Sequence, residues 1–206
     1  ASDVYKRQST TSICVYREDK LIYTHCFAEG GHHATLDISM LLDVTIAEAE
    51  NMKKSQANVD RHGIDSSQFF TIKRSQHDDE KTINMLELLE VTEARYISIL
   101  GHIKKELDKE GLSEFLQQGY VITGGGAEMR GLLPLAKKIF ANKVNKVNQH
   151  SAISAYTQYG DDDKLRTIAA MIGERKYQTA FGTLLYSQSE AFHHSEKSSP
   201  DSLQVQ

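Results

Sequence analysis

Residues 121–131 read Val-Ile-Thr-Gly-Gly-Gly-Ala-Glu-Met-Arg-Gly, and residues 132–140 continue with Leu-Leu-Pro-Leu-Ala-Lys-Lys-Ile-Phe. A short apolar run therefore leads into three glycines, Gly124, Gly125 and Gly126, and then into an amphipathic helix. Glycine has no Cβ, so a ligand can lie against this backbone, and a helix N-terminus just beyond offers N–H groups to phosphate. The stretch predicts a strand, a glycine turn and a helix, which either cradle a nucleotide or form an ordinary tight turn of an α/β domain.

Composition restricts the class of protein. The 206 residues suffice for one or two domains with a substantial core. The net charge is −4 with Lys and Arg dispersed, which gives no indication of a basic nucleic-acid-binding surface. Apolar runs stay far below the roughly 20 residues of a membrane-spanning helix, and the first residues do not resemble a signal peptide. A soluble globular protein without nucleic acid as a partner is expected.

The two cysteines fall in a predicted β-hairpin. Residues 11–16 and 21–27 are rich in β-forming side chains and flank a polar turn near Asp19. Cys14 is then expected opposite roughly position 23, and Cys26 opposite roughly position 11. Because the thiols do not face each other, we expect no disulfide and a reducing compartment, with both cysteines as small buried hydrophobic residues.

Three helices are predicted before the glycine stretch. Apolar spacing in residues 35–42 predicts the first, with Thr35 as a possible N-cap. Residues 86–107 carry one apolar stripe that predicts a long helix, and Gly111 is a suitable stop signal. Between the two, residues 55–80 are polar and less regular, and residues 68–73 form their one plausible strand.

The remaining helix carries a pair of charged residues. Thr45 and Glu48 have the spacing of a capping box, so a helix is expected to begin there. Glu50 and Lys53 are three residues apart and share a face. From spacing alone, this pair is a solvated surface ion pair.

The ends of the chain carry less pattern. Residues 1–8 look like non-native linker, residues 143–147 form a possible strand, and residues 148–176 form a polar connection. A last packed helix is expected at residues 177–186, and the hydrophilic residues 188–206 are expected to be disordered. The acidic run at residues 161–163 is typical of a solvated loop, and the side chains of the adjacent pairs His32–His33 and His193–His194 point apart, which is poor geometry for one shared metal. No metal site is therefore assigned. No order of Ser, His and Asp indicates a catalytic triad, so no catalytic residue is assigned either.

Six segments, taken in order, resemble one known family. Among them, residues 30–38 read Gly-Gly-His-His-Ala-Thr-Leu-Asp-Ile, and residues 49–53 read Ala-Glu-Asn-Met-Lys. The others are residues 10–16, 91–95, 119–131 and 179–186. This order resembles lobe two of the actin and sugar-kinase superfamily and, within it, the FtsA family of actin-like bacterial cell-division proteins.

The resemblance implies an α/β fold, an actin-like (ribonuclease H-like) second lobe with a small inserted subdomain and a disordered C-terminal tail. Residues 9–44 would begin subdomain 2A, residues 45–95 would form subdomain 2B, and residues 96–187 would complete subdomain 2A. The family's first lobe and first phosphate loop would precede residue 9. Lys6, Arg7 and Gln8 stand where the second phosphate motif normally begins, and residues 198–206 do not resemble the family's amphipathic membrane anchor.

The resemblance also implies a site for ATP, with Mg²⁺ in the intact protein. In it, Gly124, Gly125 and Gly126 would approach the adenosine and α-phosphate, and Glu50 and Lys53 would reach the ribose and adenine. Gly30 and Gly31 would line the phosphate side, and Thr10 would lie beside the β- and γ-phosphates.

The implied function is that of a cell-division protein. It would polymerise with itself and tether filaments of FtsZ, the tubulin-like division protein, to the cytoplasmic face of the membrane at the septum, through an anchor missing here. Any ATP hydrolysis would be slow, and enzymatic activity is left unassigned. Two alternatives within the superfamily remain, a sugar- or acetate-kinase-like enzyme and a pilus-assembly actin-like scaffold.

Overall fold

The computed structural model describes residues 9–18, 20–62, 65, 67–73, 80–116 and 118–146. The chain divides into two units, Ala1–Lys146 and Val147–Gln206, and every described residue belongs to the first. The linker predicted at residues 1–8 lies outside the described residues. So do the acidic run, the closing helix and the tail predicted after residue 146.

The predicted hairpin is confirmed. Strands β1 (Thr11–Arg17) and β2 (Lys20–Phe27) are antiparallel, and alternation along β1 buries Ile13 and Val15. A register shift after Val15 places Cys14 opposite Thr24 and Cys26 opposite Ser12, one residue from the expected partners. Both thiols are free and exposed, so the prediction of buried cysteines is wrong: the inward positions of β1 are occupied by Ile13 and Val15.

The first helix, α1 (Gly31–Leu41), begins four residues earlier than its apolar pattern indicated. Gly30 is the N-cap, and its carbonyl accepts a hydrogen bond from the His33 N–H at 3.0 Å. Thr35 therefore lies inside the helix and is fully buried, so its assignment as the N-cap is wrong. A glycine cap has no side chain to reveal it, which explains the error.

The second helix, α2 (Ile46–Ser55), begins as predicted. The Thr45 hydroxyl accepts from the Glu48 N–H at 3.3 Å, and the Thr45 N–H donates to the Glu48 carboxylate at 2.8 Å. These reciprocal bonds form the expected capping box and satisfy two N–H groups at the helix start.

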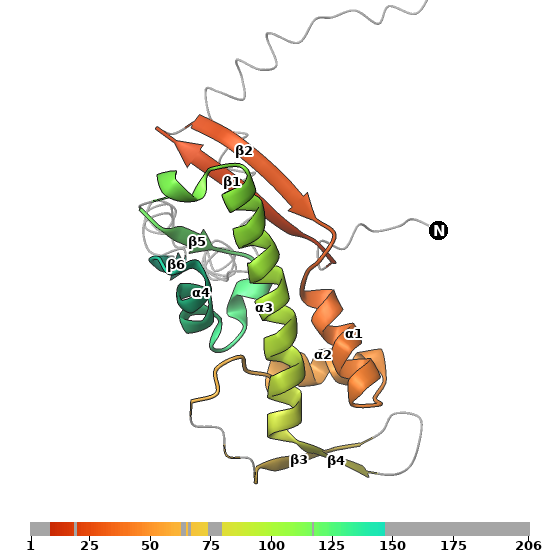
Figure 1. Cartoon of the computed structure of the whole chain (residues 1–206). Helices are drawn as coiled ribbons and strands as arrows, with labels where there is room; N and C mark the ends of the chain where they lie inside the picture. Colours follow the sequence, from red (N-terminus) through yellow and green to blue (C-terminus); the bar gives the residue numbers. More distant parts are fainter. Residues whose placement is uncertain are drawn as a thin grey trace, which may run out of the picture. The chain divides into compact units, whose positions relative to one another are not determined.

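A second hairpin precedes the long helix. The predicted strand is β3 (Phe69–Lys73), and it pairs antiparallel with β4 (Glu80–Asn84), which the sequence did not reveal. Helix α3 (Met85–Lys109) follows β4 directly, and Glu110 and Gly111 end it. In Figure 1, β3 and β4 lie at the N-terminal end of α3, and the β1–β2 hairpin lies toward its other end, where Leu107 packs with Ile13 and Val15.

The glycine stretch joins two parallel strands. β5 (Tyr120–Ile122) pairs with β6 (Val144–Lys146), and helix α4 (Leu132–Phe140) connects them. The expected strand, turn and helix are present, but a short 3₁₀ turn, η3 (Gly125–Glu128), lies between the strand and α4. A further 3₁₀ turn, η2 (Ser113–Phe115), follows α3.

One hydrophobic cluster underlies all four helices. It combines Ala34 and Ile38 of α1, Ala49 and Met52 of α2, Leu88, Tyr96 and Leu100 of α3, and Leu132, Leu135, Ala136 and Phe140 of α4. The helices that carry the candidate site therefore rest on a common core. The proposed boundaries of a small subdomain at residues 45 and 95 stay a prediction.

Candidate functional site

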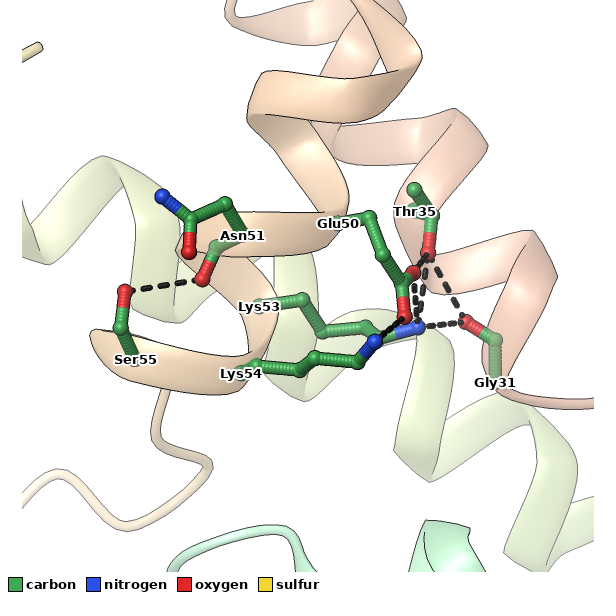
Figure 2. Close-up of polar contacts among 7 residues, drawn as sticks. All are labelled: Gly31, Thr35, Glu50, Asn51, Lys53, Lys54 and Ser55. Atoms are coloured by element: carbon green, nitrogen blue, oxygen red, sulfur yellow. Dashed lines mark hydrogen bonds and ion pairs between the residues drawn. The ribbon is translucent and has the colours of Figure 1, made fainter.

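A polar cluster joins the start of α1 to α2, and Figure 2 shows its side chains converging from the two helices. The Lys53 ammonium donates to the Gly31 carbonyl at 3.0 Å, to the Thr35 hydroxyl at 2.7 Å and to Glu50 Oε2 at 2.6 Å. An ammonium has three N–H donors, so these three acceptors can use all of them. The Lys53 side chain is 12% exposed and that of Glu50 is 26% exposed, so the pair is not a solvated surface pair.

The two oxygens of the Glu50 carboxylate have different partners. Oε2 accepts from Lys53 and from the Thr35 hydroxyl at 2.5 Å, whereas Oε1 faces the ammonium of the exposed Lys54 at 3.1 Å. Burial raises the pKa of Glu50, but the hydrogen bonds from Lys53, Thr35 and Lys54 together outweigh it and lower the pKa to about 2. At neutral pH, Glu50 is therefore an ionised group that only accepts hydrogen bonds.

Helix α3 supplies a buried phenol beside this cluster. Burial, and then the negative charge of Glu50, raise the pKa of Tyr96 to about 12. Tyr96 is 6% exposed and belongs to the common core. It therefore stays neutral at physiological pH.

The open end of the β1–β2 hairpin lies next to α1. The Thr11 hydroxyl donates to the Glu29 carbonyl at 2.7 Å, which closes the hairpin directly before Gly30. Thr10 is exposed at this same end, and the buried Gly30 donates its N–H to His33 Nδ1 at 3.2 Å. The structure thus brings Thr10, Gly30 and Gly31 to one end of the hairpin, and Lys53 binds the last of them.

The glycine turn has an open surface. Gly124 has φ +86°, a conformation that side chains disfavour. A Cβ added at Gly124, Gly125 or Gly126 would meet nothing within 4 Å in the described part of the chain. Packing therefore leaves room beside these three residues, as a backbone cradle for a ligand requires.

The N-terminus of α4 lies further from the glycines than the sequence indicated. The α4 helix begins at Leu132, after Gly131, whereas Gly124 caps the 3₁₀ turn and Gly125 and Gly126 lie within it. In that turn, the N–H groups of Ala127 and Met129 donate to the carbonyls of Gly124 and Gly126. The glycine backbone itself, rather than the N-terminus of α4, is presented on this open surface.

Arg130 connects the glycine turn to α2. Its Nε donates to the Ala57 carbonyl at 3.1 Å and its Nη2 donates to the Ser55 carbonyl at 2.8 Å. In return, the Arg130 carbonyl accepts from the Val59 N–H at 3.0 Å. The turn is therefore fastened to the C-terminal end of the helix that carries Glu50 and Lys53.

Sequence reasoning missed the roles of Thr35 and Arg130. Thr35 was assigned to a cap, although its position four residues after Gly31 would place both on one helix face if the helix began at the glycines. Arg130 gave no local signal, because its partners lie more than 70 residues away.

The described residues include neither a membrane-spanning helix nor a cluster of metal ligands. None of their helices combines the length and apolar character that a bilayer crossing demands. Their His, Cys, Asp and Glu side chains do not gather in threes as metal ligands would.

The fold is that of actin-like proteins. The chain is similar to MreB5 of Spiroplasma citri, in a crystal structure bound to ADP, with a TM-score of 0.55 and 16% identity over 74% of this chain and 53% of that one. It is also similar to a chain of the PilM–PilN type IV pilus biogenesis complex, with a TM-score of 0.57 and 15% identity over 88% of this chain and 44% of that one. The α/β, actin-like fold predicted from sequence is confirmed.

The family follows from sequence comparison. The family model described as "Cell division protein FtsA" matches residues 8–173, and this chain therefore belongs to the FtsA family. It is 30% identical over 138 residues to the cell division protein FtsA of Agrobacterium fabrum, covering 66% of this chain and 31% of that protein. The chain thus spans about a third of the length of this curated relative, and the resemblance noted in the sequence is confirmed.

Proposed function

We propose that this chain is the nucleotide-binding second lobe of an actin-like cell-division protein that binds ATP. The observation that carries the proposal is the meeting of Glu50, Lys53 and Gly31 in one cluster, joined through Arg130 to a glycine turn with an open surface. The crystal structure of MreB5, which has this fold and is bound to ADP, supports a nucleotide as the ligand.

In this proposal, each part of the site meets one part of ATP. The open backbone of Gly124, Gly125 and Gly126 lies against the adenosine and α-phosphate, and ionised Glu50 accepts hydrogen bonds from the ribose. The phosphates extend toward Gly30 and Gly31, with Thr10 at the β- and γ-phosphates. Mg²⁺ accompanies the phosphates and neutralises part of their charge. Lys53 stays with Glu50 and Gly31, and holds α1 and α2 together beside the ribose and adenine.

We base the proposed cellular role on membership of the FtsA family. The protein polymerises with itself in response to nucleotide, tethers FtsZ filaments, and acts at the cytoplasmic face of the membrane at the division site. The likeness to a PilM–PilN complex favours a second candidate, a scaffold of pilus assembly. Capture by immobilised FtsZ separates the two roles: enrichment over a control bait supports the division role, and a result equal to the control bait contradicts it.

Calorimetry of ATP binding by the protein encoded by the complete gene tests the nucleotide site. Gly125→Val places a branched side chain on the open surface of the turn, so we expect ATP binding to weaken at least tenfold. Gly101→Val is the matched control, because a Cβ added at Gly101 on α3 also meets nothing within 4 Å. Unchanged ATP affinity in Gly125→Val contradicts the assignment of the glycine turn.

A further inference from the structure

Thr35 holds the centre of the polar cluster without being accessible itself. It is fully buried, although its hydroxyl has three polar neighbours: the Gly31 carbonyl at 3.3 Å, Glu50 Oε2 at 2.5 Å and the Lys53 ammonium at 2.7 Å. A hydroxyl has one hydrogen to donate, and the charged and nearer carboxylate is the stronger acceptor. Thr35 therefore donates to Glu50 and accepts from Lys53.

The cluster leaves one acceptor atom available to a ligand. The ammonium of Lys53 has its three donors directed at internal acceptors, and Glu50 Oε2 already accepts two hydrogen bonds. Glu50 Oε1 has the ammonium of Lys54 as its partner, and the Lys54 side chain is 67% exposed. An exposed lysine gives up such a contact at little cost. A ligand hydroxyl can therefore replace Lys54 at Oε1, whereas Oε2 is held from inside.

We propose that Thr35 is a positioning residue which, with Lys53, fixes the Glu50 carboxylate so that Oε1 accepts a hydrogen bond from a ribose hydroxyl, and that Thr35 thereby sets the preference for ribonucleotides over deoxynucleotides. This inference rests on the proposed ATP site. A carboxylate held at one oxygen cannot turn to find another partner when the sugar lacks its hydroxyl. A deoxynucleotide then leaves Oε1 poorly paired, which weakens its binding.

The same geometry explains why the fixing group is a threonine on α1. The hydroxyl lies between the two charged groups of α2. It donates a hydrogen bond to Glu50 and accepts one from Lys53. Its removal leaves Lys53 with two acceptors and frees Glu50 Oε2 to rotate toward solvent. Binding of the whole nucleotide depends on many contacts, but discrimination at the sugar depends on this orientation.

The experiment compares three nucleotides in the protein encoded by the complete gene. Dissociation constants are measured by calorimetry for ATP, 2′-deoxy-ATP and 3′-deoxy-ATP. In the unaltered protein, we expect the analogue that lacks the hydroxyl meeting Oε1 to bind roughly tenfold more weakly than ATP. In Thr35→Val, which keeps the shape and removes the hydroxyl, this ratio falls to within about threefold of unity. Thr35→Ser restores the hydroxyl and the ratio.

Thr92→Val is the matched control. Thr92 is the other fully buried threonine among the described residues, and its hydroxyl donates to the Leu88 carbonyl of its own helix at 2.7 Å. We expect Thr92→Val to lower stability and to leave the nucleotide ratio unchanged. Should Thr35→Val not fold, Lys53→Met removes the second fixing group, and its ratio is expected to fall in the same way.

The outcomes separate this inference from the ATP site itself. Equal loss of affinity for all three nucleotides in Thr35→Val means that Thr35 only supports the fold, and overturns the inference. Tight binding of ATP with no preference over either deoxy analogue in the unaltered protein also overturns it, and leaves the ATP site standing. Lack of ATP binding by the unaltered protein overturns the proposed function and the inference together.

Discussion

Arg95 on α3 holds Asp37 on α1 through two hydrogen bonds, from Nε to Oδ2 at 2.6 Å and from Nη2 to Oδ1 at 2.9 Å. The hydrogen bond to Asp37 raises the pKa of the guanidinium, against the opposing effect of burial. Each side chain is about a quarter exposed, so water screens the pair less than it screens a surface pair. The contact sets the position of α1, whose first turn carries Gly31, relative to the long helix.

Arg95→Lys should lower the free energy of unfolding by about 1 kcal/mol, because an ammonium cannot make the paired contact. Arg61→Lys is the control: Arg61 also contacts a carboxylate, that of Glu93, at 2.7 Å, but its side chain is 57% exposed. For this control we expect a clearly smaller loss, because water screens the exposed pair. Urea unfolding measures both variants. Equal losses would show that the Arg95 contact gains nothing from its partial burial.

Stability should depend on pH through Glu50. Folding lowers its pKa from 4.5 to about 2, so the contribution of its charge is fully present above pH 4.5 and is lost as the pH falls toward 2. After allowance for solvent screening, we expect about 1 kcal/mol to be lost across this window. Urea unfolding of the unaltered chain and of Glu50→Gln, measured at several pH values from 6 to 2.5, isolates the contribution of the Glu50 charge to the free energy of unfolding. Parallel curves for the two proteins would contradict the assignment.

Gly131→Ala should be among the most damaging single substitutions in the described part of the chain. Gly131 has φ +77°, and an added Cβ would lie 2.5 Å from Asp60 Cβ and 2.6 Å from the Asp60 nitrogen. Conformational strain and overlap together predict a loss of about 2–4 kcal/mol. Gly111→Ala is the control for strain alone, since Gly111 has φ +65° with open space around the added atom, and about 1 kcal/mol is expected there. Thermal unfolding that ranks the two equally would mean that the Asp60 segment moves aside.

The cysteines should react in the folded protein. Because Cys14 and Cys26 are both free and exposed, Ellman's reagent should titrate two thiols per chain without denaturant. Cys14→Ser and Cys26→Ser should each reduce this number by one. Thiols that become reactive only in guanidinium chloride would restore the interpretation of both as buried hydrophobic residues.

The sequence revealed those elements whose signals are local. Thr45 and Glu48 lie three residues apart and bond to each other, so their spacing contains the whole interaction. Leu89, Tyr96, Leu100 and Leu107 repeat at helical intervals and are buried along α3, as their periodicity predicted. Propensity and packing agree at these positions.

Other elements depend on distant partners and gave no pattern. Strand β4 reads Glu-Lys-Thr-Ile-Asn, in which Ile83 is the one buried residue, and its pairing with β3 makes it a strand. The position of Arg95 off the apolar stripe gave no sign of Asp37, 58 residues away. For the candidate site, Glu50, Lys53 and the glycines were predicted by resemblance, whereas the contacts of Thr35 and Arg130 were evident only in the structure.

The contacts of Arg130 have a consequence for how a nucleotide would bind. They connect the glycine turn to the C-terminal end of α2. The two sides of the proposed adenosine site are therefore preorganised and need not close around the nucleotide. The conformational entropy of these two sides is lost when the chain folds, and less remains to be lost on binding. Loss of the Arg130 contacts would then lower nucleotide affinity without removing any group that contacts the nucleotide, just as a longer linker between two binding modules lowers their joint affinity.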